Sequence, residues 1–173
     1  MTNGGCVNQE QALLTHFLAT IAYRTQKALR DAPPHFAQFA AGHQVRTPVE
    51  ILRHMTSLMG YTRTLFLGST YPVKPEPLAT LADEIKRFHD MLAELGRLLA
   101  AGAPLREVSH QQLLQGPFAD CMTHVGQLAL LRRLADAPVA PENFVYADIH
   151  GDRLGPDQAM PARPDRHWPE RPT

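Results

Sequence analysis

Apolar residues recur every three or four positions in four separate stretches of the chain, the spacing of one face of an α-helix. The clearest stretch alternates spacings of four and three through Leu81, Ile85, Phe88, Leu92, Leu95 and Leu99. No stretch shows the strict alternation of apolar and polar residues that indicates a half-buried strand. The pattern therefore predicts an all-α protein built as a four-helix bundle.

Capping and helix-breaking residues give the bounds of the first two helices. The first apolar stripe runs from about residue 8 to residue 30 and stops before Pro33-Pro34, where proline breaks a helix. The second helix begins at Thr47-Pro48, because threonine caps a helix and proline suits its first turn, and Gly68 ends it. We expect the proline-rich residues 69–79 to connect two helices of the bundle.

The second half of the chain contains two more helices and an irregular end. Thr80 with Asp83 resembles a capping box and opens a helix to about residue 101. Ser109 with Gln112 predicts a short capped turn, and Gly116-Pro117 is expected to start the fourth helix, which ends near residue 135. Residues 1–137 are thus predicted to form the bundle.

The C-terminal residues 138–173 are rich in Pro, Asp and Arg and show little periodicity. They are too polar to form a core of their own, so we expect them to wrap the same domain. Phe144, Tyr146 and Ile149 are the expected anchors, and the last residues, from about 161, are expected to be loose.

Composition and charge exclude several classes of partner. The chain of 173 residues has 17 Lys and Arg against 17 Asp and Glu, so it lacks the basic surface that nucleic-acid or anionic-membrane binding requires. No apolar run approaches the roughly 20 residues of a membrane span, and the first residues do not resemble a signal peptide. We therefore expect a cytoplasmic protein without nucleic-acid or membrane partners. Cys6 and Cys121 give no disulfide framework.

Two histidines and an aspartate are expected to lie inside the bundle. On the fourth helix Asp120, His124 and Gln127 share a face with Leu131 and Leu134, which we expect to be buried. His54 lies at the edge of the apolar stripe of the second helix. Two imidazoles and one carboxylate are therefore predicted to converge.

Buried ionisable groups require partners, because burying a lone charge costs several kcal/mol. One solution is a hydrogen-bonded polar network, which is the more common outcome for an Asp and a His four residues apart. The other is a shared cation: His54, Asp120 and His124 suit Zn²⁺ or another first-row divalent ion and leave a coordination position open. Spacing alone leaves both solutions open.

The phrases RTPVEILRHM (residues 46–55) and THVGQLALLRR (123–133) resemble the DinB-like (YfiT-like) metalloenzyme superfamily, over roughly residues 9 to 136. The resemblance implies an up-down-down-up bundle, often a homodimer, with a divalent metal ion held by one His of the second helix and two of the fourth. His54 and His124 match two of these ligands, with Gly126 and Gln127 following as the pattern requires. Asp120 stands where the family has a third His, and a carboxylate makes the metal a weaker Lewis acid.

The resemblance also implies an activity. Family members are largely thiol-dependent transferases or isomerases, so we expect zinc or nickel, or else iron, to activate a low-molecular-weight thiol that attacks an electrophilic small molecule. Gln127 is expected to support the site, and Arg24, on the first helix, to bind an anionic group of the substrate. The alternative is a non-catalytic bundle, monomeric or dimeric, whose Asp and His residues only fix its packing.

Overall fold

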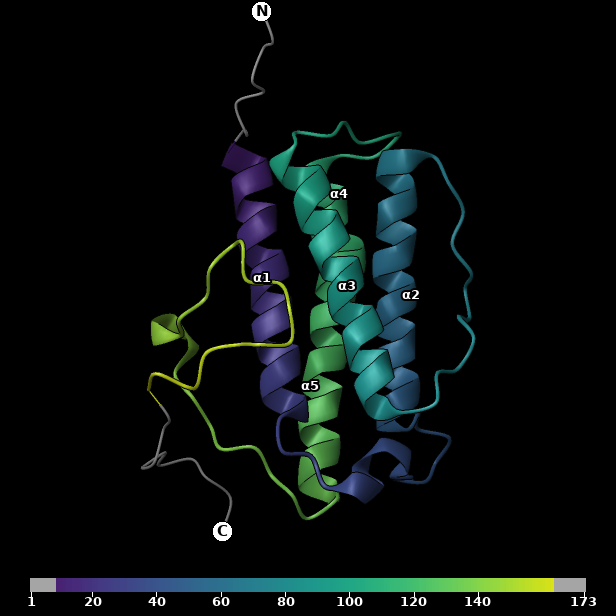
Figure 1. The fold of residues 1–173 in the computed structure, drawn as a ribbon, viewed down its shortest axis with the longest axis vertical. Coiled ribbons are helices and arrows are strands. Elements are labelled where there is room, and N and C mark those ends of the chain that lie inside the picture. The colour runs from purple at the N-terminus through teal and green to yellow at the C-terminus, as the bar shows by residue number, and fades with distance from the viewer. Residues whose placement is uncertain (1–8, 164–173) are drawn as a thin grey trace, which may run out of the picture.

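Four long helices bury the predicted apolar stripes against one another (Figure 1). The computed structural model describes residues 9–163. Within this range the chain has no strand, and the prediction of an all-α bundle is confirmed. The long helices are α1 (Gln9–Leu29), α2 (Pro48–Leu67), α3 (Leu81–Ala100) and α5 (Ala119–Leu134).

The connection between α2 and α3 determines the topology of the bundle. It runs back along the length of α2, so α2 and α3 point the same way, while α1 and α5 point the opposite way (Figure 1). This is the predicted up-down-down-up order. Helices α1 and α2 each pack against both α3 and α5, which brings the middle of α2 beside the first half of α5.

The predicted ends of the first three helices agree with the structure within about one residue, because local capping sets them. Thr47 and Glu50 form a complete capping box at the start of α2, and Gly68 ends that helix with a left-handed φ of 64°. At the start of α3 the Thr80 hydroxyl accepts a hydrogen bond from the Asp83 amide.

The predicted start of the fourth helix agrees with the structure to within about two residues. A one-turn helix, α4 (His110–Leu113), begins at the predicted Ser109 cap and is followed by a π-helical turn, η2 (Leu114–Phe118). Gly116 has the non-helical angles φ −92° and ψ −107°, which mark a kink between two helices, and α5 begins at Ala119. Proline provides no amide donor and crowds the preceding turn, so Pro117 fits the break between α4 and α5.

Residues 138–163 run along α1 on the outside of the bundle (Figure 1). Their anchors differ in part from those expected: Tyr146 is exposed, whereas Leu154 joins the core. Arg30, which directly follows α1, donates hydrogen bonds to the carbonyls of Gln158 and Ala159. The expected loose end from about residue 161 lies mostly outside the described residues.

His89 on α3 is buried, although its position beside the leucine stripe indicates a solvated side chain. Its ring is only 1% exposed, and Nδ1 donates to the Leu154 carbonyl at 2.8 Å. The wrapping segment covers this side of α3, which explains the difference. Burial lowers the pKa of His89, so the ring is neutral at pH 7.

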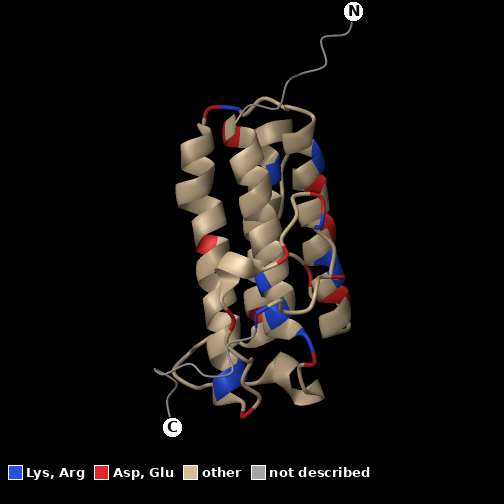
Figure 2. Cartoon of the chain, turned by 90° about the vertical axis from the view of Figure 1, so that its left-hand side faces the viewer, with Lys and Arg blue, Asp and Glu red and all other residues tan. Residues whose placement is uncertain are grey.

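The surface carries charges of both signs, which are interspersed along the bundle (Figure 2). Within the described residues, none of the helices has both the length and the apolar character of a membrane span.

Candidate metal centre

His54, Asp120 and His124 come together where α2 packs against α5. One ligand atom from each residue lies within 4.8 Å of the other two. The imidazole rings of His54 and His124 meet edge to face, with 4.7 Å between their centroids. The convergence predicted from the sequence is therefore observed, and this group has the donor atoms to bind a metal ion.

The site opens to solvent, which corrects the expectation of a buried face. His124 is 7% exposed, but the Asp120 side chain is 49% exposed and Leu134 is 52% exposed. His124 and Leu131 of the predicted face are buried, and the other buried positions of α5 include Cys121, Val125 and Leu128. The three polar residues consequently lie at the rim of the bundle, where a small molecule can reach them.

Gln127 fixes the orientation and the tautomer of His124. Its side-chain carbonyl Oε1 lies 2.7 Å from Nδ1 of His124. A carbonyl oxygen can only accept a hydrogen bond, so Nδ1 carries the proton and Nε2 keeps its lone pair. A hydrogen bond of this kind to the non-ligating nitrogen is typical of histidines that bind metal ions.

The distance between His124 and Asp120 fits two ligands better than it fits a hydrogen-bonded pair. His124 Nε2 and Asp120 Oδ1 are 3.4 Å apart, longer than a normal N–H···O bond of about 2.9 Å. Two ligands at about 2.0–2.1 Å from a tetrahedral zinc ion are separated by about 3.4 Å. The donor set thus fits a divalent ion.

His54 also presents a neutral imidazole. Burial is the main cause that lowers its pKa, and the positive charge of Arg46 and the neighbouring His124 lower it further, while Asp120 opposes them. A neutral ring offers a lone pair to a metal at pH 7, whereas a protonated ring does not.

Two hollows flank the three residues. One, of about 590 Å³, includes His54 and is lined by three cationic side chains, Arg46, Arg53 and Lys74, and by two carboxylates, Glu50 and Glu76. The other, of about 380 Å³, includes Asp120; its apolar lining consists of Leu58, Tyr61, Leu65, Val108, Leu113 and Pro117. The π-helical turn forms part of the wall of the second hollow.

Sequence analysis missed most of these lining residues. Arg46 and Arg53 lie in the same phrase as His54, so their spacing from the ligand was a usable signal. Lys74 belongs to the long connection, whose return along α2 the periodicity does not reveal. Tyr61, which also lines the second hollow, is 54% exposed.

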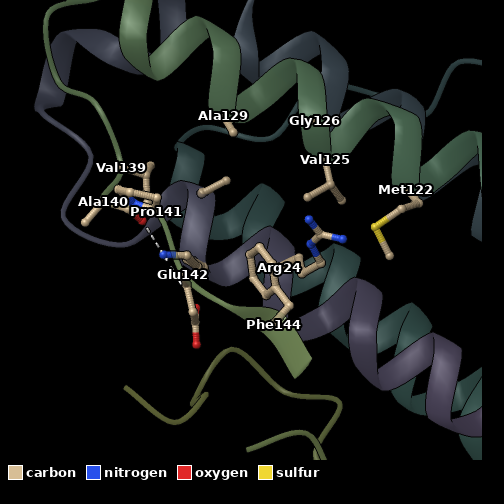
Figure 3. A pocket seen from close by; sticks show the side chains of 12 residues that line it. Arg24, Met122, Val125, Gly126, Ala129, Val139, Ala140, Pro141, Glu142 and Phe144 are labelled. Atoms are coloured by element: carbon tan, nitrogen blue, oxygen red, sulfur yellow. Dashed lines mark hydrogen bonds and ion pairs between the residues drawn. The ribbon is translucent and has the colours of Figure 1, made fainter. Parts of the chain in front are cut away.

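Arg24 and Cys121 take no part in this site. Arg24 lies in a separate cavity, against the C-terminal segment (Figure 3). Cys121 is fully buried, and burial together with the neighbouring Asp120 raises the pKa of its thiol. The thiol therefore stays protonated, and a nucleophilic role for Cys121 is disfavoured.

Comparison of the chain with models of protein families, with curated proteins and with solved structures finds no match in any of the three. The site must therefore be interpreted from its own geometry and from the motifs quoted above.

Proposed function

We propose that His54, Asp120 and His124 bind a divalent metal ion and that the chain is a metal-dependent enzyme of the DinB-like superfamily. The observation that carries this proposal is the hydrogen bond from His124 Nδ1 to Gln127, which directs the free Nε2 lone pair to the side where Asp120 and His54 lie. A polar network without metal would favour a short bond between His124 and Asp120, and the 3.4 Å separation does not supply one.

Zinc and nickel are the ions we expect first, and iron next, because imidazole is a borderline ligand that suits these ions and a carboxylate oxygen also binds them. Three protein ligands leave at least one position for an exogenous group. A divalent ion there supplies a Lewis acid that lowers the pKa of a bound thiol.

The two hollows fit the two reactants of a thiol transfer. Low-molecular-weight thiols commonly carry carboxylates, which Arg46 and Lys74 can pair with; neither side chain has an ion pair or hydrogen bond with the described residues. The apolar hollow at Asp120 suits an uncharged electrophile. In the reaction the thiol releases its proton, its sulfur bonds to the electrophilic carbon, and the leaving group departs with the electron pair.

Metal binding is tested first. Protein purified without chelator is expected to bind one Zn²⁺ or Ni²⁺ per chain, measured by elemental analysis and by competition with a chromophoric chelator. His54→Ala, His124→Ala and Asp120→Ala should each weaken binding at least tenfold. His16→Ala, an exposed histidine on α1, is the matched control and should bind as the wild type does. Equal binding by all four variants would overturn the site.

Thiol transfer is tested separately, with glutathione or cysteine and an aryl halide as the electrophile. Activity that requires added Zn²⁺ or Ni²⁺ and disappears in His124→Ala is the expected result. Stoichiometric metal without transfer to any electrophile would keep the metal site and reject the reaction. If no divalent ion binds, the Asp and His residues form only a polar network, and the chain is a non-catalytic helical bundle.

A further inference from the structure

A second cavity, of about 230 Å³, lies between α1, α5 and the C-terminal segment. Its walls are mainly apolar and include Met122, Val125 and Ala129 from α5 and Phe144 from the wrapping segment. Arg24 of α1 extends into it, with the guanidinium directed toward Met122 and Val125 (Figure 3). A volume somewhat below the usual range of about 300–1,000 Å³ suits a small ligand.

The guanidinium of Arg24 lacks a polar partner. It lies over the Phe144 ring, 3.9 Å from the ring centroid, and makes no hydrogen bond or ion pair with the described residues. Stacking covers a face of the guanidinium and leaves the N–H donors along its edges free. Arg24 is half-buried in an apolar cavity, and its guanidinium has five N–H donors. Leaving these donors without an acceptor costs free energy.

The other charged groups of the cavity neutralise one another. Glu142 is fully buried at its side chain and forms an ion pair with Lys27 at 3.5 Å. The same carboxylate accepts a 2.7 Å hydrogen bond from the Tyr23 hydroxyl, and Lys27 also donates to the Ala140 carbonyl. Two cations and one anion line the cavity, so its net charge is +1. Glu142 attracts both cations but forms its ion pair with Lys27, which leaves Arg24 without an ion pair among the described residues.

This cavity is distinct from the candidate metal centre. Helical residues advance by about 100° each, so Met122, Val125 and Ala129 lie on the opposite side of α5 from Asp120 and His124. None of the three candidate ligands lines the cavity.

We propose that this cavity is a binding site for a small monocarboxylate with an apolar body, whose carboxylate pairs with the edge of the Arg24 guanidinium. The bidentate geometry of guanidinium and carboxylate matches this role. The apolar body of the ligand contacts Met122, Val125 and Phe144. This proposal stands apart from the proposed metal-dependent function, because it uses other residues on another side of α5.

Benzoate is the probe, and benzamide, which has the same shape without the charge, is its control. The full chain carries ¹³C-methyl methionine, so that the Met122 methyl reports on the cavity while Met55 and Met59, buried in the core, report on the fold. EDTA is present throughout, which excludes binding of benzoate to a metal ion. We expect benzoate at millimolar concentration to shift the Met122 signal and benzamide to leave it unchanged.

Arg24→Gln should weaken benzoate binding about tenfold or more, since it removes a charge-assisted hydrogen bond. Arg133→Gln, an exposed arginine at the end of α5, removes the same charge elsewhere and should bind within twofold of the wild type. Arg24→Lys keeps the charge without the fork and should give an intermediate affinity. An unmoved Met122 signal, equal shifts by benzamide, or equal loss in Arg24→Gln and Arg133→Gln would each overturn the proposal.

Discussion

At the scale of single residues, one hydrogen bond separates the metal-binding interpretation from the polar network. The Gln127 carbonyl holds the proton of His124 on Nδ1, and this leaves Nε2 able to ligate. Sequence reasoning placed Gln127 near the site from the resemblance, but it did not give the tautomer, which depends on a side-chain rotamer. Gln127 therefore acts on the site through its side-chain carbonyl oxygen, which accepts this hydrogen bond. Substitutions that remove or retain the acceptor oxygen test this role.

Gln127→Leu removes the acceptor at similar size and should weaken zinc binding about 10- to 100-fold, because the His124 ring loses its orientation and its fixed tautomer. Gln127→Glu retains an acceptor oxygen and should bind zinc at least as tightly as the wild type. Competition with a chromophoric chelator at pH 7.5 measures both affinities. Similar affinities for the two variants would show that Gln127 does not act through this hydrogen bond.

Asp120 is the residue that departs from the three-histidine pattern of the resembled family. Asp120→His should retain the metal and raise the net charge of the site by one, which strengthens the Lewis acid. The pH at which thiol transfer reaches half its maximum should therefore fall relative to the wild type. Asp120→Asn removes the negative charge and replaces the carboxylate by a weaker amide ligand. This variant should bind the metal more weakly and lose it during the pH titration. An unchanged pH profile in Asp120→His would show that the charge of residue 120 does not set the Lewis acidity of the metal.

At the scale of helices, local capping was predictable and the rotation of α5 was not. Thr47, Glu50 and Gly68 act on their own neighbours, so the bounds of α2 follow from short sequence motifs. Helix α5 carries leucines on several sides, at positions 128, 130, 131 and 134, and the stripe chosen from the sequence ended on an exposed Leu134. Packing against α1 and α2 buries Val125 and Leu128 in addition to part of that stripe.

Alanine substitutions at two glycines test how the long α2–α3 connection packs against α2. A Cβ on Gly60 would lie 2.2–2.4 Å from three ring carbons of Tyr71, so Gly60→Ala must displace the ring and should destabilise the fold by about 1 kcal/mol or more. Gly126 on α5 has no such neighbour within 4 Å, and Gly126→Ala should stabilise by about 0.5–1 kcal/mol through helix propensity. Urea unfolding measures both, and equal effects would contradict the docked position of Tyr71.

At the scale of the whole molecule, the wrapping segment changes the environment of residues far away in the sequence. It buries His89 through Leu154 and gives Tyr23 the carboxylate of Glu142 as a partner. These contacts span 65 and 119 positions and involve a segment without periodicity. Patterns along the chain therefore predicted that the segment wraps but not which residues it covers.

The buried His89 makes stability depend on pH. Burial lowers its pKa in the folded state below the unfolded value of about 6.5, so the unfolded chain binds more protons as the pH falls. Stability should therefore be complete above pH 7 and decrease below about 6.5, with a loss on the order of 1 kcal/mol at most by pH 5.5 from this group alone. His89→Asn keeps a donor for the Leu154 carbonyl without titrating. Its urea-derived stability should therefore fall less between pH 7.5 and 5.5 than that of the wild type, with His16→Asn, which replaces an exposed histidine, as the matched control. A decrease of the same size in His89→Asn would assign the pH dependence to other groups.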